Sequence, residues 1–118
     1  MSRSIHSRSS HTIAKRESYA ALFAALGDET RLALVAKLCG GRPLSISQLT
    51  EGSKLTRQSI TKHLRVLESA GVVRGARSGR ECLFDFNPKP FRELREYLGK
   101  ISRQWDEALG RLKAFVER

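Results

Sequence analysis

Several features are scarce in this chain of 118 residues, and each absence excludes a class of protein. Two cysteines far apart in sequence make neither a disulfide framework nor a zinc motif. No apolar run approaches the roughly 20 residues that span a bilayer, and the first residues lack the apolar stretch of a signal peptide. We therefore expect a cytoplasmic protein with reduced thiols and no membrane contact.

Residues and motifs that are typical of enzyme active sites are scarce as well. The chain has three histidines, two of them within residues 1–16, and no glycine motif that cradles a phosphate. An enzymatic function has almost no support, and no cofactor is expected.

Basic residues, by contrast, are abundant: 22 Lys and Arg against 12 Asp and Glu leave a formal charge of +10. This excess favours a polyanionic partner, with nucleic acid ahead of an anionic membrane surface. A merely solvated basic surface has the same composition, so the placement of the charges decides between the two interpretations.

Two regions differ in composition. Residues 1–16, "MSRSIHSRSSHTIAKR", are basic and serine-rich with few apolar side chains, which predicts a flexible basic arm. Residues 17–118 predict one domain. A single copy of this size buries only a modest core, so a second copy would add stability.

The first half of that domain predicts four helices. "SYAALFAALG" is followed by a helix that Asp28 caps and Gly40-Gly41 ends. A short helix follows, with Ser45 and Gln48 at capping-box spacing, and Thr56 caps a longer one over 56–70. The last two predict a helix-turn-helix. The expected buried face of the helix after Asp28 is Leu32, Val35, Leu38 and Cys39.

The helix over 56–70 has two unlike faces. Ile60, Leu64 and Leu67 share one side, whereas Gln58, Lys62 and Arg65 lie opposite. Gln pairs bidentately with adenine and Lys with guanine, so the polar face is suited to reading bases in a major groove. Arg57 is expected on a phosphate, and His63 either in helix packing or on a phosphate. The candidate DNA-binding residues of this segment are Thr56, Arg57, Gln58, Ser59, Thr61, Lys62, His63 and Arg65.

After Gly71 the pattern becomes alternating and predicts a β-hairpin with a turn at Arg77-Ser78-Gly79. Arg74, Arg77 and Arg80 bracket its tip, where they can contact phosphates or a minor groove. The expected inward face of the hairpin is Cys82, Phe84 and Phe86.

The chain closes with a long amphipathic helix. Its stripe covers roughly 40 Å, more than so small a domain can bury by itself, which implies a second chain. The stripe consists of Phe91, Leu94, Leu98, Ile101, Trp105, Leu109, Leu112 and Val116.

The segments "LFAALGDETRLALVAKL", "LSISQLTEGSKLTRQSITKHLRVLESAGVV" and "GRECLFDFNP" resemble the ArsR/SmtB family of bacterial winged-helix repressors. The resemblance implies a mostly α fold in the order α-α-α-α-β-β-α, with the hairpin as the wing and a homodimer that uses the first and last helices. The interface residues that it implies are Leu22, Phe23, Leu94, Leu98, Ile101, Trp105, Leu109 and Leu112.

Two kinds of sensing occur among such proteins, by metal and by thiol. A Cys-x-Cys metal pair would fall on Ser45 and Ser47, and no histidine follows His63 for a site on the last helix, so we expect no metal at either place. A redox switch between Cys39 and Cys82 stays open as an alternative.

These observations together predict a homodimeric repressor that binds an inverted repeat in double-stranded DNA. A winged-helix adaptor that binds a partner protein is the other alternative, although residues 58, 62 and 65 would then more often be apolar anchors.

Overall fold

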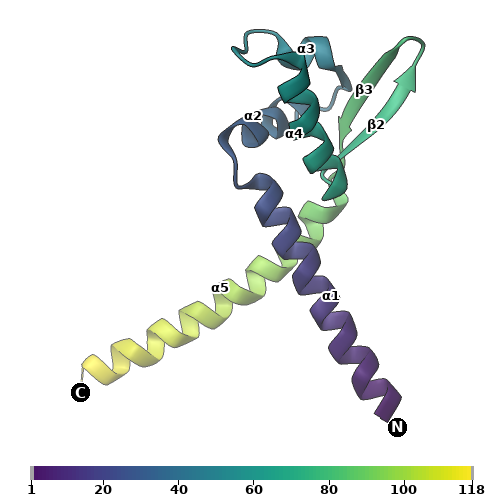
Figure 1. Cartoon of the computed structure of the whole chain (residues 1–118). Helices are drawn as coiled ribbons and strands as arrows, with labels where there is room; N and C mark the ends of the chain where they lie inside the picture. Colours follow the sequence, from purple (N-terminus) through teal and green to yellow (C-terminus); the bar gives the residue numbers. More distant parts are fainter. Residues whose placement is uncertain (1, 118) are drawn as a thin grey trace. The chain divides into compact units, whose positions relative to one another are not determined.

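The computed structural model describes the backbone of residues 2–117 and the side chains of residues 13–117. It forms two compact units, residues 1–88 and 89–118, each described by itself below. The elements are α1 (Ser2–Leu26), α2 (Glu29–Leu38), β1 (Leu44–Ser45), α3 (Ile46–Thr50), α4 (Arg57–Ser69), β2 (Val73–Ser78), β3 (Glu81–Phe86) and α5 (Lys89–Val116) (Figure 1). The predicted mostly helical fold with a hairpin is confirmed, and β1 is an element that the sequence analysis did not predict.

Local capping signals set where three helices begin. The Asp28 carboxylate accepts a hydrogen bond from the Arg31 backbone N–H at 3.0 Å. Ser45 and Gln48 form the full capping box that begins α3, with bonds of 3.1 and 2.8 Å. The Thr56 hydroxyl accepts from the backbone N–H of Ser59 at 3.1 Å. All three predicted caps are confirmed.

The core of the first unit forms where α2, α3 and α4 meet the root of the hairpin. The three predicted apolar residues of α4, Ile60, Leu64 and Leu67, are buried. Leu38 from α2 and Leu49 from α3 are also buried completely. Burial of these side chains fixes the orientation of α4 and leaves its polar face outward.

The predicted buried face of α2 is partly wrong. Val35 and Leu38 are buried as expected, but Leu32 is 52% exposed and Leu34 is buried in its place. At about 100° per residue Leu32 lies roughly 160° from Leu34, so the two cannot share a face. Cys39 is exposed because it is the C-cap, where the chain already leaves the helix.

The sheet has the strand order β1-β3-β2, and both pairings are antiparallel. Arg77 and Ser78 pair with β3, so the turn lies at Gly79-Arg80 and the predicted turn at Arg77-Ser78-Gly79 is wrong. Gly79 has φ of 64°, and a positive φ at the first of two loop residues suits a hairpin turn that matches the twist of the strands.

Only part of the predicted inward face of β3 is buried. Phe84 is buried and Phe86 is half-buried, but Cys82 is exposed. Cys82 pairs with Arg77 near the tip, where the hairpin extends beyond the helices that cover its root (Figure 1). The expectation for Cys82 is therefore wrong.

The second unit is α5, a single helix of 28 residues. In the part of the chain that the structure describes, no helix has an apolar stretch long enough to cross a membrane. The predicted basic arm, residues 1–16, falls mainly on side chains outside the described residues, so its flexibility and its boundary stay predictions. The described backbone of α1 passes residue 16 without a break.

Candidate nucleic-acid interface

The outward face of α4 carries the base-reading candidates. Gln58, Lys62 and Arg65 are exposed, and so is Arg57 in the first turn. Thr61 is half-buried, and its hydroxyl donates to the Arg57 carbonyl at 2.7 Å. In this rotamer Thr61 has only its lone pairs left for a partner. Ser59 is also half-buried and Thr56 is exposed.

The three wing arginines are not equivalent. Arg74 lies near the root, where it pairs with the Asp85 carboxylate across the strands at 3.6 Å and donates to the Phe86 carbonyl at 3.4 Å. Arg77 and Arg80 are exposed at the tip, and no ion pair involves either of them among the described residues. The tip arginines are therefore better placed than Arg74 to meet a phosphate.

An open groove of about 400 Å³ lies between α4 and the wing. Arg65 borders it from the helix, and Arg77 and Arg80 border it from the hairpin. Ile46 and Phe84 add apolar surface to its lining. Arginine binds phosphate oxygens with paired N–H donors, so this groove is suited to a nucleic-acid backbone. The position of Arg65 beside the wing arginines was not predicted from the sequence.

The root of the wing is held to α4 by residues that sequence reasoning missed. The backbone N–H of Gly75 donates to Glu68 Oε2 at 3.2 Å. Gly75 stands opposite Phe84 in the sheet, and a Cβ on it would lie 3.0 Å from Glu68 Oε2 and 3.1 Å from the Phe84 ring. The glycine thus lets α4, β2 and β3 approach one another. An isolated Gly inside a strand pattern was the available signal.

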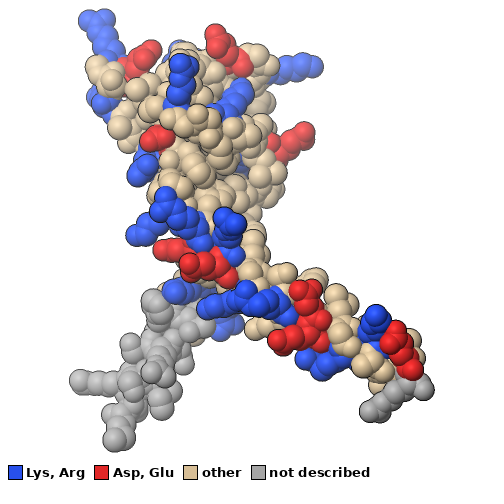
Figure 2. All heavy atoms as spheres, turned by 180° about the vertical axis from the view of Figure 1, so that it is seen from behind, with Lys and Arg blue, Asp and Glu red and all other residues tan. Residues whose placement is uncertain are grey.

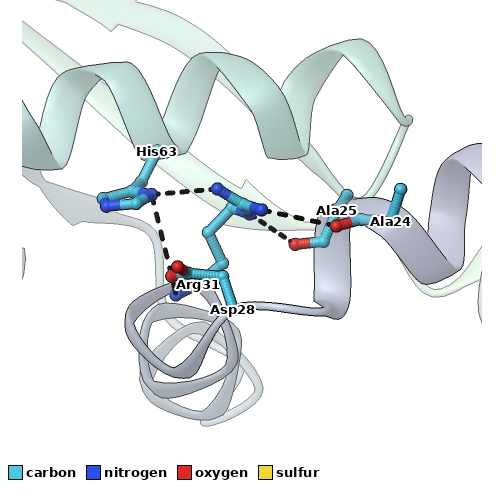
Figure 3. Close-up of polar contacts among 5 residues, drawn as sticks. All are labelled: Ala24, Ala25, Asp28, Arg31 and His63. Atoms are coloured by element: carbon cyan, nitrogen blue, oxygen red, sulfur yellow. Dashed lines mark hydrogen bonds and ion pairs between the residues drawn. The ribbon is translucent and has the colours of Figure 1, made fainter.

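His63 lies on the other side of α4, against the start of α2 (Figure 3). Its Nδ1 atom is 3.2 Å from Arg31 Nη1 and 3.9 Å from Asp28 Oδ2. This geometry favours the helix-packing alternative over a phosphate contact. The backbone hydrogen bond from Arg31 is the main cause that holds the pKa of Asp28 below its ordinary value of 3.8, and the positive charge of Arg31 adds to it.

Both cysteines are free thiols on the surface. The expectation of a packed Cys39 is therefore wrong, whereas Cys82 borders the groove between α4 and the wing. Within the described residues no three His, Cys, Asp or Glu side chains cluster as metal ligands would.

The apolar residues expected at a dimer interface divide into two groups. Leu22 in α1 and Leu94 in α5 are buried in the single chain, so they have little surface left for a partner. Ile101 is half-buried. The exposed members are Phe23, Leu98, Trp105, Leu109 and Leu112. On the face of α5 that Figure 2 shows, acidic and basic side chains lie close to one another.

The chain is similar in sequence and fold to known helix-turn-helix regulators. Residues 26–76 match a family described as a helix-turn-helix domain. The uncharacterized HTH-type transcriptional regulator YuzN of Bacillus subtilis is 39% identical over 80 residues, which cover 63% of this chain and 87% of YuzN. The HTH-type transcriptional repressor SmtB of Mycobacterium tuberculosis is 35% identical over 63 residues, 53% of this chain and 46% of SmtB.

A solved structure of an ArsR-like transcriptional regulator from Rhodococcus sp. RHA1 aligns with a TM-score of 0.74 and 31% identity, over 86% of this chain and 95% of that one. The fold and the relatives define a DNA-binding transcriptional regulator of the winged helix-turn-helix class. The chain belongs to the ArsR/SmtB family of these regulators.

Proposed function

We propose that this regulator is a homodimeric repressor that reads an inverted repeat in double-stranded DNA. The observation that carries the proposal is the division of α4 into a completely buried apolar face and an exposed face with Gln58, Lys62 and Arg65. A helix fixed in this way presents a constant set of donors and acceptors to a major groove.

The groove beside α4 supports a contact with the DNA backbone. Arg65, Arg77 and Arg80 border the same space, so one phosphate segment can meet arginines from both the helix and the wing. Such contacts fix the register of the protein on the duplex while Gln58 and Lys62 read the bases.

The proposed dimer rests on the apolar residues that the protomer leaves exposed. Trp105, Leu109 and Leu112 follow one another at spacings of four and three, which places them on one face of α5. An exposed apolar stripe of this kind marks an interaction site, and a second copy of the same helix offers a matching stripe. Two copies of α4 would then meet half-sites about one helical turn apart, and their occupation of a promoter would exclude polymerase.

The proposed repressor does not use a metal site at Ser45 and Ser47, one of the two places that the family resemblance raises. Ser45 is buried, and its hydroxyl accepts the bond that begins α3, so it serves the capping box. A hydroxyl is also a poor ligand for zinc or soft ions. Stoichiometric zinc retained by the purified dimer after dialysis would contradict this part of the proposal.

The test is a selection of random duplexes by the full-length protein, followed by fluorescence anisotropy on the enriched duplex and on a scrambled one. We expect an enriched inverted repeat with half-site centres about 10 base pairs apart or at a multiple of that spacing. Binding should be at least about 1,000-fold tighter than to scrambled DNA. Equal, salt-sensitive binding to both duplexes would contradict a sequence-specific repressor.

A further inference from the structure

Arg31 connects three helices of the first unit. Its Nη2 donates to the Ala24 carbonyl at 3.3 Å and its Nε to the Ala25 carbonyl, both in the last turn of α1. The same guanidinium approaches His63 of α4 through Nη1 at 3.2 Å, and its own backbone lies in α2 (Figure 3). One planar, permanently charged group thus satisfies terminal carbonyls of α1 and reaches the middle of α4.

The contact with Arg31 selects one tautomer of the neutral His63 ring. A guanidinium has only donors, so Nδ1 must accept and the neutral ring carries its proton on Nε2. A proton on Nδ1 would turn the acceptor into a donor and place two positive charges 3.2 Å apart. Protonated His63 would instead favour Asp28, 3.9 Å away.

The groups around His63 are few. The charged groups that face it are Asp28 and Arg31, both from the start of α2, and α1 contributes the two carbonyls that hold Arg31. In the described part of the chain no hydrogen bond or ion pair joins His63 to α3 or β2. Imidazole is the side chain that ordinarily changes charge between about pH 5 and 8, whereas Arg31 stays charged.

We propose that Arg31 is a positioning residue that links the end of α1 to α4 through neutral His63, and that protonation of His63 breaks the link and weakens DNA binding. The inference rests on the proposed function, because it matters only if α4 reads DNA and α1 contributes to a dimer. The spacing of the two α4 helices then depends on how firmly each is tied to α1.

The sign of the effect separates this inference from simple electrostatics. Acidification adds positive charge to a DNA-binding protein and by itself strengthens binding to phosphates. Loss of the Arg31–His63 link acts in the opposite direction. A decrease in affinity at lower pH therefore has no explanation in net charge.

The experiment uses the full chain with His6 and His11 replaced by Gln, which leaves His63 as the one histidine. A second protein also carries His63→Asn, whose Oδ1 accepts a hydrogen bond but does not titrate. Anisotropy on the selected duplex at about pH 7.5 and pH 5.8, with ionic strength constant, gives the ratio of dissociation constants for each protein. Thermal melts at both pH values check that each protein is folded.

We expect the dissociation constant of the protein that keeps His63 to rise about fivefold at the lower pH, while that of the His63→Asn variant changes less than about twofold. Arg31→Lys, which keeps the charge but loses the planar fork, should bind more weakly at the higher pH and respond less to acid. Long-range ¹H–¹⁵N spectra should show Nδ1 unprotonated in the neutral ring.

Equal ratios for the protein that keeps His63 and for the His63→Asn variant, tighter binding in acid, or a neutral ring protonated at Nδ1 would overturn the inference alone. Failure of every protein to bind any duplex specifically at the higher pH would instead contradict the proposed function.

Discussion

Helices α4 and α5 carry the same kind of apolar stripe, but the protomer uses the two differently. Ile60, Leu64 and Leu67 of α4 are at most 1% exposed, whereas Trp105 and Leu109 of α5 are 69% and 60% exposed. The spacing of apolar residues along a helix identifies the face that avoids water. It does not identify the partner that covers this face. Here the α4 stripe is covered within the protomer, and the α5 stripe stays exposed in the single chain.

The largest effect should follow from a substitution in the buried stripe of α4, which should lower the free energy of unfolding. Leu64→Ala leaves a cavity in a side-chain cluster that has no solvent access, so we expect a loss of about 3 kcal/mol in the free energy of unfolding, measured by urea denaturation. Leu112→Ala is the matched control in α5. Its effect should depend on protein concentration, because the proposal places Leu112 in the dimer interface. A loss below about 1 kcal/mol for Leu64→Ala would contradict the described core.

A substitution in the exposed stripe of α5 should affect dimerisation and leave the fold of the protomer intact. Leu109→Lys places a charge in the proposed interface and should weaken dimerisation by about 2 kcal/mol, or roughly 30-fold, in sedimentation equilibrium. Circular dichroism of the protomer should change little. Arg103→Ala, on the opposite face of α5, is the control that should remain dimeric. If the parent protein sediments as a monomer, the assignment of this stripe to a second copy is wrong.

The polar faces of the two helices allow a third comparison. Lys62→Ala in α4 should reduce discrimination between the selected and the scrambled duplex by about 1–2 kcal/mol. Arg77→Ala in the wing should weaken both similarly and lower the salt slope by about 1. Lys100→Ala, which removes a charge from α5, should change neither quantity. Equal losses on both duplexes for Lys62→Ala would argue against base reading by α4.

The smallest effect concerns the charge of the cap beside α4. The pKa of Asp28 in the folded protein lies below its ordinary value of 3.8, so the ionised carboxylate adds stability above that pH. This stability is lost as the pH falls through the lower folded pKa. Asp28→Asn keeps a good N-cap without the charge, so its melting temperature should be lower than that of the parent near neutral pH. The two melting curves should converge in strong acid, and a constant difference would contradict the charge as cause.

Features that depend on neighbouring residues were predictable from the sequence. The caps at Asp28, Ser45 and Thr56 and the buried face of α4 follow from side chains three or four positions apart. The two-residue strand β1 has too short a pattern to be recognised, and it exists because β3 offers it a partner. The turn was misplaced because Ser78 and Gly79 are both common in turns, and the pairing register decides between them.

Contacts between distant segments could not be predicted. The groove that joins Arg65 to Arg77 depends on how the wing packs against α4, and that packing depends on Gly75 and Glu68. The inward turn of His63 depends on the position of Arg31, 32 residues earlier. The face of α2 was ambiguous because Leu32 and Leu34 are equally apolar, and only the packing chooses Leu34.

Because Gly75 lies at the root of the wing, a small displacement there becomes a larger displacement at the tip. From Gly75 to the turn at Gly79 the strand extends about 13 Å, at roughly 3.3 Å per residue. A side chain at position 75 would press on the Glu68 carboxylate and on the Phe84 ring. If the wing tilted by only about 10° in response, the tip arginines would move about 2 Å, enough to break a hydrogen bond. A mutational scan for DNA binding should therefore find this glycine less tolerant of substitution than its exposure alone predicts.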